Sequence, residues 1–245
     1  MTDERSQLIY LLKIAYSNPD HSERYEEQKE NLEMMKRIIT INPSLTIEER
    51  GLLALVYKNL INSRRVILRS LNGFIQECKG NEYRLNKLTE FKEVLLAELD
   101  EYCLDLCSMV ENKLLPITTS PEFRVYYEKL QADYYRYMAE FREDYEKSEY
   151  AEKANNHYEA ALDIAKSELP RSSPSHLGLV LNYSVFLFET MERRQEALDL
   201  AQKVYTECAD CINDMSDGTY SETSKILSIL RENYLLWKSK SDSNQ

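Results

Sequence analysis

Turn-forming residues are scarce in this chain, and their scarcity limits the folds open to it. The sequence has five glycines and six prolines in 245 residues, whereas average usage is about 7% and 5%. Hairpin-rich folds need more tight turns than these residues can supply. Between the few breaks, apolar residues recur with the 3.6-residue period of a helix. The sequence therefore predicts an all-α protein built from long helices.

Breaks and capping signals divide the chain into nine predicted antiparallel helices joined by short loops. Thr46 followed by Glu49 has the spacing of a capping box, so a long helix should begin near Ile47. A second such spacing, from Thr219 to Glu222, should open the last helix. The helices are expected over residues up to 18, then 22–42, 47–79, 85–114, 123–144, 150–168, 176–189, 193–213 and 219 to beyond 237.

Composition and cysteine usage predict a cytoplasmic protein. The hydrophobic content of 43% is ample for a core, and we expect one domain over residues 1–240 with a short disordered tail at 241–245. No window reaches the ~18 uninterrupted apolar residues of a membrane span. The five cysteines are odd in number and lie inside helical patterns, which favours reduced, buried thiols.

Charge is distributed unevenly along the chain. The formal net charge of -11 should repel polyanions, which excludes nucleic acid and anionic membranes as partners. Residues 57–70, "YKNLINSRRVILRS", are nevertheless basic, and no acidic residue occurs from Gly51 to Gln76. An amphipathic helix normally mixes both signs on its wet face. We infer that an anion from outside the helix neutralises these cations.

The cations on the third predicted helix share one face. Lys58, Arg65 and Arg69 lie at i, i+7 and i+11, which places them within about 40° at ~100° per residue. Arg64 lies on a different face of this helix from these three residues. A solvated face or ion pairs with a neighbouring helix would explain the same pattern without any ligand.

A second basic group lies on the fifth predicted helix. Lys129 and Arg136 repeat the i, i+7 spacing, and Tyr137 follows Arg136. Guanidinium groups, an ammonium and a phenol are the donors that a phosphate dianion prefers. Asp133 and Glu140 flank Arg136 and are expected to act as local partners or orienters.

Two further helices carry asparagine beside apolar residues. An asparagine amide offers both a donor and an acceptor, which suits the backbone of an extended peptide. A buried asparagine bonded to neighbouring backbone would give the same pattern. The first face holds Asn182, Val185 and Glu189, and the second holds Ile226, Ile229, Asn233 and Trp237.

A helical-repeat scaffold is the main alternative binding module. "EAALDIAKSE" at 159–168 and "EALDLAQKVY" at 196–205 lie about 36 residues apart, close to the tetratricopeptide period. This similarity between two segments occurs only once in the chain, and about three repeats are needed for a continuous core. Such a scaffold would bind unphosphorylated partner peptides through a carboxylate clamp.

Enzymatic and metal-binding classes find little support. The chain lacks a His-Glu-x-x-His motif, a glycine-rich phosphate loop and the Glu-x-x-His pairs of di-iron bundles. Cys208 with Cys211, and Cys103 with Cys107, have spacings that suit zinc, but their apolar neighbours favour buried thiols. We expect neither catalysis nor a cofactor.

Four segments, in order and at matching separations, resemble signature segments of the 14-3-3 family. They are "YKNLINSRRVILR" at 57–69, "DYYRYMAEF" at 133–141, "LGLVLNYSVF" at 177–186 and "ILRENYLLW" at 229–237. The resemblance covers nearly the whole chain. It implies a nine-helix protomer of a family characteristic of eukaryotes, whose concave amphipathic groove binds phosphoserine or phosphothreonine peptides of client proteins in signalling. It also implies a cup-shaped homodimer or heterodimer.

The resemblance assigns roles residue by residue. The family's phosphate pocket falls on Lys58, Arg65, Arg136 and Tyr137, with Arg69 nearby. Its peptide-holding residues fall on Lys129, Asn182, Glu189 and Asn233, and its apolar wall falls on Leu181, Val185, Ile229 and Trp237. An intersubunit ion pair falls on Arg24 and Glu98.

This chain departs from the family pattern at several positions. Val66, Ile67 and Leu68 replace the usual Ser-Ser-Trp, so a phosphorylation switch at that dimer-facing serine cannot operate. Val94 replaces a lysine of the dimer seam that usually pairs with an acid near Glu27. Lys225 stands where an apolar groove residue is usual, which is expected to change peptide preference on that side.

Overall fold

The chain is all-α over the residues that the structure describes. The computed structural model describes residues 3–17, 25–78, 80–209 and 217–242, and it contains helices and no strand within them. The chain divides into two compact units, Met1–Thr118 and Thr119–Gln245. Within the described part, no helix combines the length and apolar character needed to cross a bilayer.

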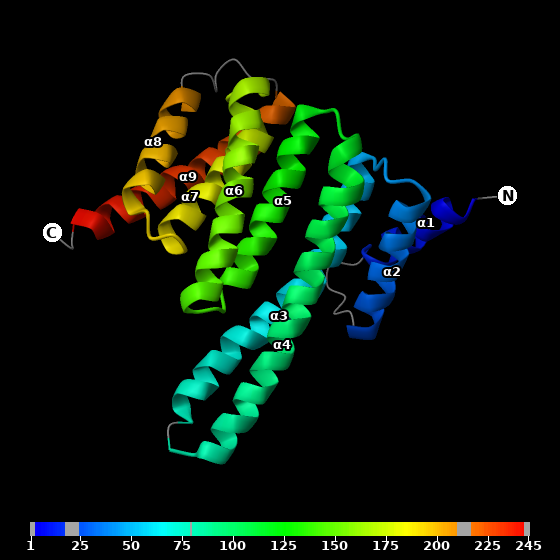
Figure 1. The fold of residues 1–245 in the computed structure, drawn as a ribbon. Helices are drawn as coiled ribbons and strands as arrows, with labels where there is room; N and C mark the ends of the chain where they lie inside the picture. The colour runs from blue at the N-terminus through cyan, green and yellow to red at the C-terminus, as the bar shows by residue number, and fades with distance from the viewer. Residues whose placement is uncertain (1–2, 18–24, 79, 210–216, 243–245) are drawn as a thin grey trace. The chain divides into compact units, whose positions relative to one another are not determined.

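The described residues of the first unit form four α-helices, which Figure 1 colours from blue to green. Helix α3 packs against α4, α1 packs against α2, and α2 also contacts α3. Pro116 ends the last of these helices by way of a π-helical turn at Val110–Leu114 and a 3₁₀ turn at Leu115–Ile117. The four are α1 (Glu4–Ala15), α2 (Tyr25–Ile41), α3 (Ile47–Glu77) and α4 (Glu82–Met109).

The predicted capping box opens α3 as expected. The Thr46 hydroxyl accepts a hydrogen bond from the backbone N–H of Glu49 at 3.3 Å, and the Glu49 carboxylate accepts from the N–H of Thr46 at 2.8 Å. Arg5 of α1 also donates to Glu49 at 3.0 Å. The box therefore fixes the start of α3 and ties it to α1.

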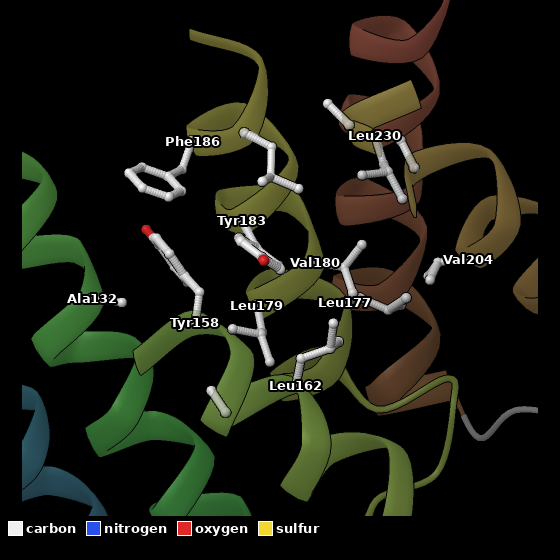
Figure 2. Packing of buried hydrophobic residues seen from close by; sticks show 14 of the residues in the cluster. Ala132, Tyr158, Leu162, Leu177, Leu179, Val180, Tyr183, Phe186, Val204 and Leu230 are labelled. Carbon is white, nitrogen blue, oxygen red and sulfur yellow. The ribbon is translucent and has the colours of Figure 1, made fainter. Parts of the chain in front are cut away.

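In the second unit, the part of the chain that the structure describes forms five helices packed around one core. Helix α5 lies along α6, and α7 contacts α6, α8 and α9. Figure 2 shows aromatic rings at the centre of this core, where Tyr158, Tyr183 and Phe186 are buried against one another. The helices are α5 (Pro121–Ala139), α6 (Asp144–Glu168), α7 (Pro174–Glu189), α8 (Arg194–Ala209) and α9 (Asp217–Asp242).

The predicted junction between the fifth and sixth helices was placed wrongly. Helix α5 ends at Ala139, not near 144, and α6 begins at Asp144, six residues before the predicted start at 150. Asp144 has φ of +49°, a left-handed conformation that Asp adopts more readily than most residues. The chain thus turns here without Gly or Pro, so the sequence carries neither of the usual break signals at this junction.

Smaller differences occur at other helix ends. Asn81 caps α4 by accepting from the N–H of Arg84 at 3.1 Å, so α4 starts at Glu82 and not at 85. Helix α9 begins at Asp217, so the second predicted capping box lies inside the helix. It reaches Asp242, two residues into the predicted tail.

Removing the α3 cap should destabilise the protein measurably. Thr46→Ala deletes the hydroxyl that satisfies the N–H of Glu49, and such losses typically reduce the free energy of unfolding by about 1 kcal/mol. Urea unfolding followed by circular dichroism measures the change. Ser44→Ala is the matched control, because the bond that Ser44 makes to Asn42 at 2.9 Å comes from its backbone N–H, which the substitution keeps. Equal stability of both variants would contradict the capping role.

Candidate functional site

A buried carboxylate organises the polar residues of the second unit. Asp133 of α5 is only 6% exposed. Lys129 Nζ lies 2.8 Å from one of its oxygens, and Arg136 Nη2 lies 3.4 Å from the other. Asn182 of α7 donates from Nδ2 to both oxygens at 3.1 Å. The structure therefore brings three predicted site residues together around the residue predicted to orient them.

Tyr158 of α6 completes this network and was missed from the sequence. Its hydroxyl donates a short hydrogen bond to Asp133. The tyrosine is fully buried in the core beside Phe186 (Figure 2). No local signal separates it from the other tyrosines of the chain, because its partner lies 25 residues away in sequence.

The charges in the network support one another. Burial alone would raise the pKa of Asp133, but Lys129 and Arg136 outweigh it and hold the pKa below the ordinary value of 3.8. Burial would likewise lower the pKa of Arg136, and the neighbouring Tyr158 and Asp133 raise it instead. Asp133 is thus ionised and Arg136 is charged at neutral pH.

Arg136 keeps donor capacity beyond this network. Its Nε is buried and has no hydrogen-bond partner in the described structure, and a guanidinium offers five N–H donors. Its Cζ lies 4.9 Å from the ring centroid of Tyr137. Two of the four residues predicted to bind phosphate are therefore neighbours. Glu140 is exposed at the C-terminal end of α5.

The first unit carries the other predicted phosphate ligands on α3. Lys58 and Arg69 are exposed and Arg65 is half-buried, with its Nη1 donating to Asn62 at 3.2 Å. Arg64 is buried and points elsewhere, as predicted. Its Nε lies 2.9 Å from Glu98, and its Cζ lies 3.7 Å from the ring centroid of Tyr25.

Glu98 is therefore already engaged within its own chain. It was predicted to pair with Arg24 of a second subunit, and Arg24 lies outside the described residues. Val66 and Val94, which replace polar residues of the family's dimer seam, are 59% and 56% exposed. Ile67 is 40% exposed, whereas Leu68 is buried.

The remaining predicted peptide-binding residues differ in exposure. Trp237 is 4% exposed and stacks on Phe188 with ring centroids 4.6 Å apart, so its ring belongs to the core as well as to any apolar wall. The half-buried residues are Leu181, Val185 and Asn233, and the exposed ones are Glu189, Lys225 and Ile229.

The cysteines considered for zinc are buried where the structure describes them. Cys103, Cys107 and Cys208 are each at most 3% exposed. The thiol of Cys208 donates to the backbone carbonyl of Arg171 at 3.2 Å. Cys211 lies outside the described residues.

Within the described residues, the chain is an all-α protein in which basic and amide side chains gather around a buried carboxylate. A family model described as "14-3-3 protein" matches residues 20–238. The chain belongs to the 14-3-3 family, which decides against the tetratricopeptide alternative.

Similar proteins support this assignment over nearly the whole chain. The checkpoint signal transducer rad25 of Schizosaccharomyces pombe is 37% identical over 247 residues, which covers 100% of this chain and 89% of that protein. The 14-3-3-like protein GF14 iota of Arabidopsis thaliana is 37% identical over 238 residues, with 96% and 86% covered. The 14-3-3-like protein B of Vicia faba is 35% identical over 240 residues, with 97% and 89% covered.

Because of Asp133, the free energy of unfolding should decrease as the pH falls below about 3.8, the ordinary pKa of Asp. A carboxyl whose pKa is lower in the folded state than in the unfolded state stabilises the fold above the unfolded value, and this contribution disappears as the pH falls through the folded value. Asp133→Asn should therefore be less stable than the wild type at pH 7, by roughly 3–5 kcal/mol if it behaves like other broken buried pairs.

The test compares urea unfolding of both proteins at pH 7 and at pH 3. The difference between them should shrink below about pH 3.8, the ordinary value for Asp. An equal difference at both pH values would show that the charge of Asp133 does not stabilise the fold.

Proposed function

We propose that this protein is a signalling adaptor that binds phosphoserine or phosphothreonine segments of client proteins, without catalysing a reaction. The network around Asp133 is the observation that carries the proposal. It holds Lys129, Arg136 and Asn182 in fixed positions while leaving a buried Arg136 Nε without a partner. Membership of the 14-3-3 family supports the same function.

The phosphoryl group supplies the charge that the basic residues need. A phosphoserine carries about -1.5 to -2 charges at pH 7, and a bond between charged partners is worth roughly 1.5–3 kcal/mol. In this proposal Lys58 and Arg65 of α3, with Arg136 and Tyr137 of α5, bind the phosphate. Arg69 shares the basic face of α3 with Lys58 and Arg65. A neutral serine offers none of this attraction, so phosphorylation would act as the binding signal.

Other residues would hold the peptide on either side of the phosphate. Asn182 and Asn233 would bind its backbone, with Lys129 and Glu189 beside them. Leu181, Val185, Ile229 and Trp237 would form the apolar wall, although Trp237 also packs in the core. Lys225 is expected to favour an acidic peptide residue nearby, because its ammonium replaces an apolar side chain.

Lys58→Glu should weaken phosphopeptide binding at least tenfold, because it replaces an attraction of roughly 1.5–3 kcal/mol with repulsion. The measurement is fluorescence anisotropy of a labelled Arg-Ser-x-pSer-x-Pro peptide, alongside its unphosphorylated form. Circular dichroism should show unchanged helicity.

The matched control is Lys113→Glu, which makes the same charge change at another exposed lysine of the first unit. The control should bind like the wild type. Equal binding of both peptide forms to the wild type would overturn the proposed function, and unchanged affinity of Lys58→Glu would remove Lys58 from the site.

We also propose that the protein forms a homodimer or heterodimer whose seam depends on apolar contacts. Glu98 is bonded to Arg64 of its own chain at 2.9 Å. Exposed Val66, Ile67 and Val94 offer apolar surface where the family's seam is polar. Burial of apolar area contributes about 25 cal/mol per Å² and is little affected by salt screening.

Val66→Asp should raise the dimer dissociation constant at least tenfold, because the new carboxylate would be desolvated in the contact. Sedimentation velocity over a concentration series measures the constant. Raising the salt from 0.1 to 0.5 M should change it little in the wild type. Phe74→Asp introduces the same charge at another exposed position of α3. If the contact is confined to the surface around Val66, this control should leave the dissociation constant unchanged. A protein that stays monomeric at all concentrations would refute the homodimer.

A further inference from the structure

A pocket in the second unit shares no residue with the network around Asp133. It has a volume of about 380 Å³ and lies among α6, α7 and α8. Small-molecule sites commonly occupy about 300–1,000 Å³. Leu162, Leu200 and Val204 supply its apolar lining. Leu162 and Val204 also belong to the core cluster shown in Figure 2.

A buried histidine lines this pocket, and one of its ring nitrogens has no hydrogen-bond partner in the described structure. His176 of α7 lines the pocket and is 5% exposed. One ring nitrogen bonds to the backbone carbonyl of Pro170, while Nδ1 is buried and has no hydrogen-bond partner in the described structure. Burial lowers the pKa of His176, so the neutral ring donates from Nε2 and offers Nδ1 as an acceptor.

An unsatisfied buried acceptor is unfavourable, typically by 1–3 kcal/mol. A ligand whose N–H or O–H group reached Nδ1 would remove this cost. The pocket thus combines an apolar lining with one specific polar contact, which is the usual composition of a small-molecule site.

The charges at the rim favour an anion. Lys166 and Lys203 line the pocket and are exposed, and Asp199 is the acid beside them. Arg171 and Glu207 also line it but neutralise one another, with Arg171 Nη1 3.1 Å from the carboxylate of Glu207. These five charged side chains sum to +1, whereas the whole chain has a formal charge of -11. The rim is therefore locally basic on an acidic protein.

We propose that this pocket binds a small amphiphilic anion: an apolar or aromatic body against Leu162, Leu200 and Val204, a carboxylate or phosphate near Lys166 and Lys203, and a hydroxyl or N–H that donates to Nδ1 of His176. This site is independent of the proposed phosphopeptide site.

The probe for the first test is 3-(4-hydroxyphenyl)propionate, which carries all three features. Titration into the full-length ¹⁵N-labelled protein should shift the amide signals of α6, α7 and α8 around the pocket. The shifts should saturate with a dissociation constant of roughly 0.1–1 mM, which is reasonable for so small a ligand. 3-Phenylpropionate, which lacks the donor, should bind several-fold more weakly. The amine analogue 3-(4-hydroxyphenyl)propylamine should not bind.

Two variants locate the site. Lys203→Glu should weaken binding at least tenfold, and Leu200→Trp should abolish it by filling the pocket. Lys238→Glu, the same charge change on α9 outside the pocket lining, should bind like the wild type. Phosphopeptide affinity should be unchanged in all three variants.

Several results would overturn the proposal. They are an absence of saturable shifts up to 10 mM, binding of the amine as tight as that of the acid, or unchanged affinity in Lys203→Glu. Because Lys203 is exposed, this variant should fold normally even if Leu200→Trp does not.

Discussion

The polar half of the second unit depends on the buried carboxylate of Asp133. An ionised carboxylate in a protein interior is strongly unfavourable unless cations and donors surround it. Here Lys129, Arg136, Asn182 and Tyr158 do so from three helices. The carboxylate in turn fixes the orientation of three side chains of the proposed peptide site. A ligand that meets preorganised donors loses less entropy and therefore binds more tightly.

The same physical rule accounts for the contrast between two adjacent arginines on α3. Arg64 is buried and finds Glu98 and the ring of Tyr25 within its own unit. Arg65 is half-buried and bonds to a neutral amide, Asn62, at 3.2 Å. Two adjacent arginines of one basic segment thus differ in role: Arg64 stabilises helix packing, whereas Arg65 is a residue of the proposed phosphate site.

Much of this organisation could be predicted from the sequence because the signals are local. The capping box at Thr46 and the orienting role of Asp133 depend on residues three or four positions apart, and helical geometry fixes such pairs. The turn before Asp144 was missed because a left-handed Asp, not Gly or Pro, makes it. Tyr158 and the free nitrogen of His176 were missed because tertiary packing alone defines their partners, and sequence spacing does not record it.

The affinity of Asp133→Asn for a phosphoserine peptide tests the central claim most directly. This substitution removes a negative charge beside Lys129 and Arg136, so attraction by net charge alone would strengthen binding of the anionic peptide. If Asp133 acts by orienting these cations and Asn182, affinity should fall at least tenfold while helicity is retained. Unchanged or tighter binding would contradict the account, because the cations would then bind phosphate without the carboxylate that holds them in place.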